Sequence, residues 1–163
     1  MAASCTIREA RPEDLDDLVE LLGLLFSLES DFAPDAQKQR EGLALMLGKG
    51  PRVVLVAVSP DETRADGSGR VLGMATAQLV VSTAEGGPAL LVEDVVVRPE
   101  TRGRGIGKAL IARIEAWGRR LGATRLQLLA DRDNTGSHGF YEACGFSPTN
   151  LVCLRRLIPA NAK

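Results

Sequence analysis

Residues 93–107 read Glu-Asp-Val-Val-Val-Arg-Pro-Glu-Thr-Arg-Gly-Arg-Gly-Ile-Gly. The short apolar run at 95–97 is typical of a buried strand, and from residue 106 onward apolar residues recur at helical spacing. The glycines at the end of the stretch therefore stand at a strand-to-helix junction. N–H groups at the start of a helix are unpaired and partially positive, and glycines let a ligand approach the backbone closely. The stretch predicts a phosphate-binding turn.

Basic residues strengthen this prediction, because Arg102, Arg104 and Lys108 add full positive charges to the turn. Two better-known phosphate turns do not match. A P-loop would need Gly at position 102 and Ser or Thr at position 109, where Arg102 and Ala109 stand, and the dinucleotide pattern would need Gly at position 108. The alternative that the glycines only form a tight turn stays open from these residues alone.

A second stretch, residues 134–146, reads Asn-Thr-Gly-Ser-His-Gly-Phe-Tyr-Glu-Ala-Cys-Gly-Phe. Together with Arg-x-x-Gly-x-Gly at 102–107, it resembles the GCN5-related N-acetyltransferase (GNAT) superfamily in motif order and spacing. Glu-Asp at 93–94 resembles the diamine acetyltransferase branch of that superfamily. The resemblance covers nearly the whole chain and implies acetyl-CoA as cosubstrate, but it does not specify the acceptor.

The resemblance also implies which residues bind acetyl-CoA. The backbone of the glycine turn should hold the pyrophosphate, and the preceding strand should pair with the pantetheine amides. These cofactor-binding residues are Val95, Val96, Val97, Arg102, Gly103, Arg104, Gly105, Ile106, Gly107 and Lys108. Asn134 and Ser137 should lie near the CoA arm, and a helix cap is the alternative role for both.

Two residues are the predicted catalytic groups. Tyr141, the only tyrosine, falls on the family tyrosine that protonates the departing CoA thiolate, and a buried core tyrosine is the alternative. A primary ammonium with a pKa of about 10.4 is almost fully charged at neutral pH, so a base must assist. Glu93 and Asp94 would face opposite sides of a regular strand, so only one would face the cleft. The resemblance favours Glu93 as the base, with a structural carboxylate as the alternative, and Asp94 is assigned to substrate binding.

The charges are distributed unevenly along the chain. Residues 1–50 hold five Lys or Arg against ten Asp or Glu, whereas residues 98–125 hold eight against two. A polyanionic cofactor at the basic segment and a cationic acceptor near the acidic one would explain both signs, and solvated helix faces are the alternative. Within the acidic segment, the candidates for acceptor recognition are Glu29, Asp31 and Asp35, because this region borders the acceptor cleft in the family.

Composition limits the other possibilities. A chain of 163 residues has the length of one domain, so we expect a single domain over residues 1–163. A net charge of −1 and 4% aromatic residues argue against a nucleic-acid partner. The chain contains no apolar run long enough for a signal peptide or a membrane span, so we expect a cytoplasmic protein. Three irregularly spaced cysteines and one histidine argue against a metal site.

The periodicity predicts an α/β (α+β) fold, in which helices flank a mixed, mostly antiparallel twisted sheet of about six to seven strands, as in the GNAT fold. Expected strands cover 4–9, 53–58, 71–81, 89–97, 126–130 and 151–157, with a polar loop at 60–69. The first expected helix begins near residue 12. Three further helices are expected over 35–47, 106–121 and 134–143. The turn-forming residues 85–88 predict an antiparallel hairpin. In the family, the strand ending at Val97 splays from the strand beginning near Leu126, and the pantetheine arm fills the gap.

These observations predict direct acetyl transfer from acetyl-CoA to a primary amine of a small cationic acceptor, such as a polyamine or an amino-acid derivative. Neither the Cys nor the Ser in the motifs is predicted to act as a covalent nucleophile. A peptide or protein amino group is the second candidate acceptor. A non-catalytic acyl-CoA sensor is a different class of function, and it could dispense with Tyr141 and Glu93. The resemblance also favours a homodimer.

Overall fold

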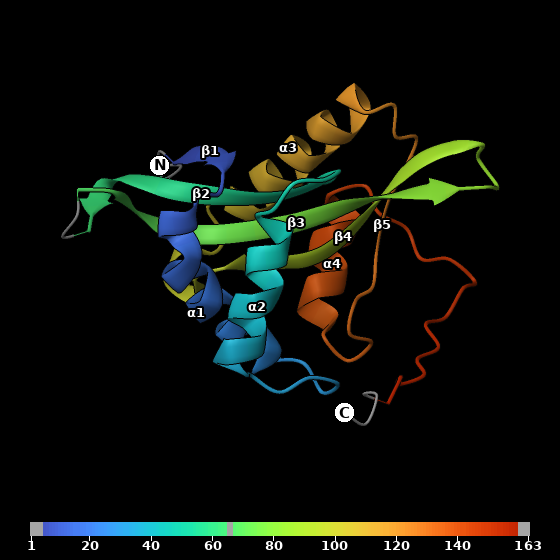
Figure 1. The fold of residues 1–163 in the computed structure, drawn as a ribbon, viewed down its shortest axis with the longest axis horizontal. Coiled ribbons are helices and arrows are strands. Elements are labelled where there is room, and N and C mark those ends of the chain that lie inside the picture. The colour runs from blue at the N-terminus through green and yellow to red at the C-terminus, as the bar shows by residue number, and fades with distance from the viewer. Residues whose placement is uncertain (1–4, 65–66, 160–163) are drawn as a thin grey trace.

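A computed structural model describes residues 5–64 and 67–159 of the chain. Its sheet has five strands in the order β1-β2-β3-β4-β5 (Figure 1). These are β1 (Thr6–Glu9), β2 (Arg52–Thr63), β3 (Gly69–Ser82), β4 (Gly87–Val97) and β5 (Leu126–Leu128). Neighbours from β1 to β4 are antiparallel, and only β4 and β5 are parallel. The predicted mixed, mostly antiparallel GNAT architecture is therefore confirmed, as is the hairpin between β3 and β4.

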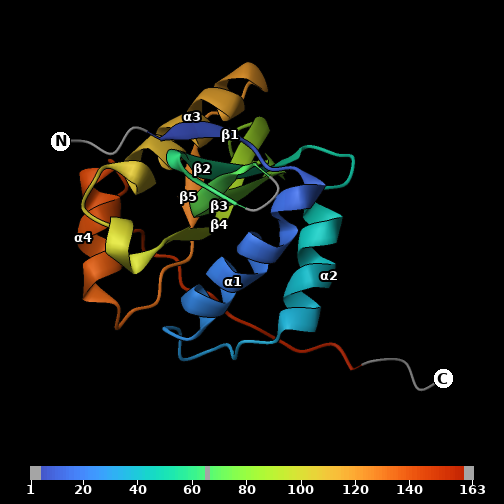
Figure 2. The same cartoon turned by 90° about the vertical axis from the view of Figure 1, so that its left-hand side faces the viewer.

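Helices cover both faces of this sheet (Figure 2). On one face lie α1 (Leu15–Phe26), which follows a 3-10 turn at Pro12–Asp14, and α2 (Ala36–Met46). Their apolar residues, such as Leu18 and Leu43, pack on Val56 and Met74. The opposite face is covered by α3 (Ile106–Arg120), which follows a second 3-10 turn at Pro99–Thr101, and by α4 (Thr135–Ala143).

The pairing between β4 and β5 is short. The two strands pair at only three positions, Leu90 with Leu126, Leu91 with Gln127 and Val92 with Leu128. β4 then continues to Val97 without β5 beside it. The splay that the resemblance implied is therefore present, and it opens at the end of β4 that leads into the glycine turn.

A β-bulge interrupts β4 where it leaves its partner. The register with β3 passes from Val92 opposite Ala77 to Val95 opposite Ala75, so Glu93 and Asp94 together oppose Thr76. The sequence-based expectation of a regular strand, with these two carboxylates on opposite faces, is therefore wrong. Glu93 accepts a hydrogen bond from Gln78 and Asp94 accepts one from Thr76. Thr76 and Gln78 are two residues apart on β3, so they share a face of the sheet. Because each of them binds one of the carboxylates, Glu93 and Asp94 lie on that same face.

The strand predicted at 151–157 is absent, so the sheet has fewer strands than the six to seven expected. Apolar residues gave this segment a strand-like pattern, but within the described chain it pairs with no strand. It is held instead by Arg155, whose guanidinium lies 4.7 Å from the centre of the Phe32 ring and 3.7 Å from Asp31. Its large apolar side chains stay exposed: Leu151, Val152, Leu154, Leu157 and Ile158. The homodimer stays a prediction.

The polar loop predicted at 60–69 is shorter than expected, because β2 extends to Thr63 and β3 begins at Gly69. Within the described parts of the chain, no helix is long and apolar enough to cross a membrane. The same residues contain no group of three or more His, Cys, Asp or Glu side chains placed to hold a metal ion.

Candidate active site

A cleft of about 980 Å³ lies where β4 and β5 part. The end of β4 and the glycine turn form one wall, and the segment after β5 with the first turns of α4 forms the opposite wall. The C-terminal end of α1 and the residues that follow it close a third side through Leu25, Leu28 and Glu29. The two motifs recognised in the sequence therefore face each other across one cavity.

The glycine turn has the backbone of an anion site. Gly103 and Gly105 have φ angles of 72° and 81°, in the left-handed region that favours glycine. A Cβ placed on either residue would meet no atom within 4 Å, so the space above this backbone is open to a ligand. Gly107 serves a different purpose, because a Cβ there would lie 3.0 Å from the Phe140 ring. It allows α3 and α4 to approach.

The basic residues of the turn differ in where their side chains point. Arg102 lines the cleft and its Nε donates to the Val97 carbonyl over 3.0 Å. Arg104 turns back to the Glu100 carbonyl at 3.2 Å and is not part of the cleft wall. Lys108 lines the cleft one turn into α3. Positive charge at this end therefore comes from Arg102, Lys108 and the unpaired N–H groups of the first turn of α3.

The backbone of β4 presents hydrogen-bonding groups to the cleft. The N–H of Asp94 donates to the Thr76 hydroxyl, and that of Arg98 donates to the Leu72 carbonyl, so both point toward β3. Main-chain groups alternate in direction along a strand, so those of Val95 and Val97 point to the side that β5 has left. Val96 buries its side chain in the cluster that contains α1, and it also lines the cleft. An extended ligand with amide groups could pair with Val95 and Val97 as a missing strand would.

Carboxylates gather at the other end of the cleft, which we call the acidic end. Glu29, Glu93 and Asp131 line the cleft there, and Asp94, which is not part of the wall, is close enough to Glu29 to raise its pKa. Glu29 follows α1, and Asp131 follows β5 and accepts from the Ser30 N–H over 3.4 Å. Burial raises the pKa of Glu29, and the charges of Asp94, Asp131 and Asp31 raise it further. Carboxylates that raise the pKa of one another favour a cationic ligand.

Asp94 is the most perturbed carboxylate of this end. Burial raises its pKa to about 6, the charge of Glu93 adds to the rise, and the hydrogen bond from Thr76 opposes it. A carboxylate with this pKa is mostly ionised at neutral pH, yet it accepts a proton more readily than an exposed one. Asp94 therefore has the acid–base properties of a group that can exchange protons in the physiological range.

Tyr141 lies on α4 and faces the same cleft. Its ring packs against Phe140 and Phe146, with centroids 5.1 and 5.7 Å away. Burial raises the pKa of Tyr141 to about 12, and Cys144, Glu29 and Asp94 contribute further. The phenol therefore stays protonated at physiological pH and is available as a hydrogen-bond donor to a group that gains negative charge.

The helix that carries Tyr141 is capped by the residues predicted for it. Asn134 accepts from the Ser137 N–H at 3.1 Å, and the Ser137 hydroxyl donates to the Asn134 carbonyl at 2.8 Å. Both residues also line the cleft. Their contact with the CoA arm is therefore compatible with capping and stays a prediction. The exposed His138 ring nitrogen Nε2 lies 2.9 Å from the Asp131 carbonyl oxygen.

Besides Asp94, two acidic residues proposed for acceptor recognition lie outside the cleft wall. Asp31 pairs with Arg155 at 3.7 Å, and Asp35 caps α2 by accepting from the Lys38 N–H at 3.1 Å. Sequence reasoning missed Asp131, although its place directly after a predicted strand and before the Asn134 motif was a usable signal. It also missed Thr101 and Leu28, which line the cleft but belong to no motif.

Comparison with known proteins identifies relatives of this chain. The sequence model described as the acetyltransferase (GNAT) family matches residues 18–146. An aminoglycoside N(6')-acetyltransferase type 1 from Stenotrophomonas maltophilia is 30% identical over 161 residues, which cover 96% of this chain and 95% of that protein. A protein of the same name from Salmonella typhimurium is 31% identical over 91 residues, 54% of this chain and 63% of that protein.

Solved structures share the fold. A putative acetyltransferase from Agrobacterium tumefaciens is 27% identical, with a TM-score of 0.72 over 93% of this chain and 99% of the other. AAC(6')-Iy, solved in complex with the bisubstrate analogue CoA-S-monomethyl-acetylneamine, is 23% identical, with a TM-score of 0.76 over 96% of this chain and 99% of the other. At that identity, the second likeness supports the fold alone.

The turn geometry predicts unequal roles for Gly105 and Arg104. Gly105→Val should weaken acetyl-CoA binding by at least about tenfold, because a side chain at a left-handed position strains the turn and fills the anion site. Arg104→Ala should weaken it by less than about threefold, because its side chain is outside the cleft wall. Calorimetric titration with acetyl-CoA measures both dissociation constants.

Gly86→Val is the matched control, because Gly86 has a φ of 68° in the β3–β4 turn, which is not part of the cleft wall. It should strain the backbone without changing the acetyl-CoA dissociation constant. Equal, mild effects of Gly105→Val and Arg104→Ala would contradict the backbone role of the turn.

Proposed function

The chain belongs to the acetyltransferase (GNAT) family and is an acetyl-CoA-dependent N-acetyltransferase, and we propose that its acceptor is a small polycationic amine of the aminoglycoside class. One observation carries this proposal. The cleft is basic and rich in unpaired N–H groups at the glycine turn, and it is acidic between the end of α1 and the end of β5. This arrangement suits a polyanionic donor at one end and a polycationic acceptor at the other.

The relatives favour aminoglycosides within the class of small cationic amines. The Stenotrophomonas maltophilia relative, aligned over nearly its full length, and the shorter Salmonella typhimurium match are both aminoglycoside N(6')-acetyltransferases. The sequence-based expectation of a polyamine or an amino-acid derivative shares the chemistry of a primary ammonium beside other polar groups. A polyamine, as in the diamine acetyltransferase branch, is therefore the second candidate acceptor within the same site.

The residues present fit acetyl-CoA. The open space above Gly103 and Gly105, with the N–H groups of the first turn of α3, would accept the pyrophosphate. The free edge of β4 at Val95 and Val97 would pair with the pantetheine amides. Asn134 and Ser137 would contact the same arm from the opposite wall. When bound, acetyl-CoA supplies the activated acetyl group and a thiolate leaving group.

Tyr141 would act on the sulfur side of the reaction. Its pKa of about 12 exceeds that of a thiol, which is about 8.5, so full proton transfer to a free thiolate is uphill by about 5 kcal/mol. Tyr141 therefore donates a hydrogen bond to the sulfur as charge develops there, and the proton can follow from the phenol or from solvent. Its packing against Phe140 and Phe146 fixes the direction of the hydroxyl.

Carboxylates of the acidic end would prepare the acceptor. Only about one part in a thousand of a primary amine of pKa about 10.4 is neutral at neutral pH, which corresponds to about 4 kcal/mol. We assign Glu93 as the base, since it lines the cleft and is exposed to water that can relay the proton. Asp94, which lies on the same face because of the β-bulge but outside the cleft wall, would attract the ammonium through its charge and is the alternative base because its pKa is about 6.

Two other functions differ from this proposal in what they require of the cleft. Acetylation of a peptide or protein amino group would need a cleft that accepts a chain with only one cationic end. A non-catalytic acyl-CoA sensor would keep the glycine turn, but it would not need Tyr141 and the carboxylates to face the same cavity. Their convergence supports an enzyme.

Replacing Tyr141 by Phe should lower kcat by about a hundredfold, because the hydroxyl acts only once charge develops on the sulfur. The acetyl-CoA dissociation constant should stay within about twofold of that of the wild type, since the ring is retained. Steady-state kinetics with calorimetric titration separates the two quantities. An unchanged kcat would remove Tyr141 from the mechanism.

The pKa of Asp94 predicts a step in the pH profile. Because this pKa is raised from 3.8 to about 6, the carboxyl is protonated below about pH 6 and loses its attraction for the ammonium there. The wild-type kcat/KM for the acceptor should therefore rise through about pH 6, and Asp94→Asn should remove that step.

Glu93→Gln should be most impaired at neutral pH and should recover at high pH, where the amine is already neutral. A deficit of Glu93→Gln that is equal at both pH values would exclude its role as a base.

The acceptor is tested by chromatographic CoA release with neamine, spermidine, lysine and a peptide with a free amino terminus. We expect release to be fastest with neamine, and Glu29→Gln with Asp131→Asn should raise the KM for neamine more than that for lysine, because neamine carries more cationic groups. Faster release with the peptide would support the peptide alternative. No release with any acceptor, despite tight acetyl-CoA binding, would favour the sensor.

A further inference from the structure

Arg98 is a buried arginine at the point where β4 ends and the cofactor turn begins. Its side chain is only 4% exposed, and its Nε donates to the Val71 carbonyl over 2.8 Å. Its backbone N–H also bonds β3, through the Leu72 carbonyl at 2.8 Å. Nothing in the proposed chemistry uses this residue, and it is not part of the cleft wall.

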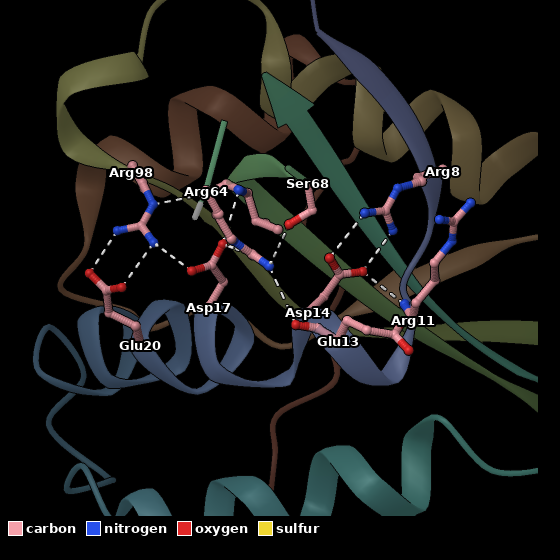
Figure 3. Close-up of polar contacts among 10 residues, drawn as sticks. Arg8, Arg11, Glu13, Asp14, Asp17, Glu20, Arg64, Ser68 and Arg98 are labelled. Atoms are coloured by element: carbon pink, nitrogen blue, oxygen red, sulfur yellow. Dashed lines mark hydrogen bonds and ion pairs between the residues drawn. The ribbon is translucent and has the colours of Figure 1, made fainter. Parts of the chain in front are cut away.

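The guanidinium of Arg98 reaches across to α1 (Figure 3). Its two terminal nitrogens donate to the two carboxylate oxygens of Glu20 at 2.7 and 2.9 Å, and one of them lies 3.7 Å from Asp17. Asp17 in turn accepts from the Val71 N–H at 3.0 Å and pairs with Arg64. A two-point arginine–carboxylate pair fixes orientation as well as distance. Arg98 therefore holds the middle of α1 against the sheet in one defined position.

Both elements that Arg98 joins continue into the cleft. Its backbone carbonyl accepts from the N–H and the hydroxyl of Thr101, at 2.9 and 3.0 Å, and Thr101 lines the cleft directly before the glycine turn. From Glu20, α1 runs on toward Leu25 and Leu28, which line the acceptor side. One side chain thus connects the wall that holds the donor to the wall that faces the acceptor.

We propose that Arg98 is a positioning residue for acetyl transfer, which sets the separation between the C-terminal end of α1 and the cofactor turn through its pair with Glu20. Stability alone is a weak explanation for this pair, because the Glu20 side chain is 58% exposed and ion pairs with an exposed partner contribute little to stability. Fixing α1 keeps Glu29 at a constant distance from the end of β4, so the acceptor amine meets the donor in one geometry.

Arg8 and Asp14 provide a matched control in the same protein. Arg8 donates to both oxygens of Asp14, at 2.7 and 3.0 Å, and so ties the residue before α1 to β1 (Figure 3). Neither residue lines the cleft. Asp14 has a side chain 2% exposed, whereas Glu20 is 58% exposed, so Arg8→Met leaves the more buried carboxylate unpaired. The control should therefore lower the melting temperature at least as much as Arg98→Met.

The first measurement needs no acceptor. Hydrogen exchange of the amides in residues 24–31 should be about tenfold faster in Arg98→Met than in the wild type, with or without bound CoA, because the C-terminal half of α1 opens locally. In Arg8→Met, the exchange rate of this segment should change only as much as the lower global stability of that variant requires. Equal exchange of residues 24–31 in both variants would overturn the proposal.

The second measurement is kinetic and rests on the acceptor proposed above. With neamine, Arg98→Met should raise the acceptor KM about tenfold and keep the acetyl-CoA dissociation constant within about twofold, and Arg98→Lys should recover only part of the loss. Glu20→Gln, which keeps the side-chain length, should fall between wild type and Arg98→Met. If Arg8→Met raises the neamine KM as much as Arg98→Met, Arg98 is merely structural. If neamine is not acetylated at all, the proposed acceptor fails and the exchange measurement alone decides the role of Arg98.

Discussion

The site depends on the point where β4 and β5 separate. A parallel pair that ends at Val92 and Leu128 leaves the last part of β4 with main-chain groups directed into a cavity rather than toward a neighbouring strand. Main-chain N–H and C=O groups require partners when water is excluded, so this edge favours a ligand that can hydrogen bond like a strand. The glycine turn and the first N–H groups of α3 follow directly, so the same ligand can reach an anion site at its far end.

The charges at the two ends of the cleft would orient that ligand and its reaction partner. The glycine turn offers positive charge, whereas at the acidic end Glu29 and Glu93 line the cleft and the charge of Asp94 acts on Glu29. Tyr141 belongs to this electrostatic set, because Glu29 and Asp94 contribute to raising its pKa. A cationic acceptor would offset those carboxylates and lower the phenol pKa toward that of the thiol. In the proposed mechanism, acceptor binding and proton donation would therefore be linked through the same two side chains.

Local patterns in the sequence were enough to predict the glycine turn, the helix that carries Tyr141, and the hairpin before β4. These features depend on spacing within a few residues of the motif itself. The bulge at Glu93 and Asp94 could not be predicted in this way, because it arises from the register of β4 against β3. A regular strand would have left one carboxylate on the wrong face, whereas the bulge places both on the same side.

Long-range contacts explain the other differences. Residues 151–157 have the composition of a strand, but a strand also needs a neighbour with free main-chain groups, and this segment is held by Arg155 on Phe32 instead. Asp131 lies between the two motif stretches, and Arg98 has no predicted role within the first; only the fold brings Asp131 beside Ser30 and Arg98 beside Glu20. The motifs therefore predicted much of the cleft wall at the glycine turn and on α4, whereas they missed Asp131 at the acidic end.

The most direct test of this account is a crystal structure of the protein with CoA and neamine bound together. The account predicts the pyrophosphate on the backbone of the glycine turn, the pantetheine amides on Val95 and Val97, and an amino group of neamine among Glu29, Glu93 and Asp94, on the side of the cleft that Tyr141 faces. Neamine bound away from these carboxylates, or CoA bound away from the free edge of β4, would contradict it.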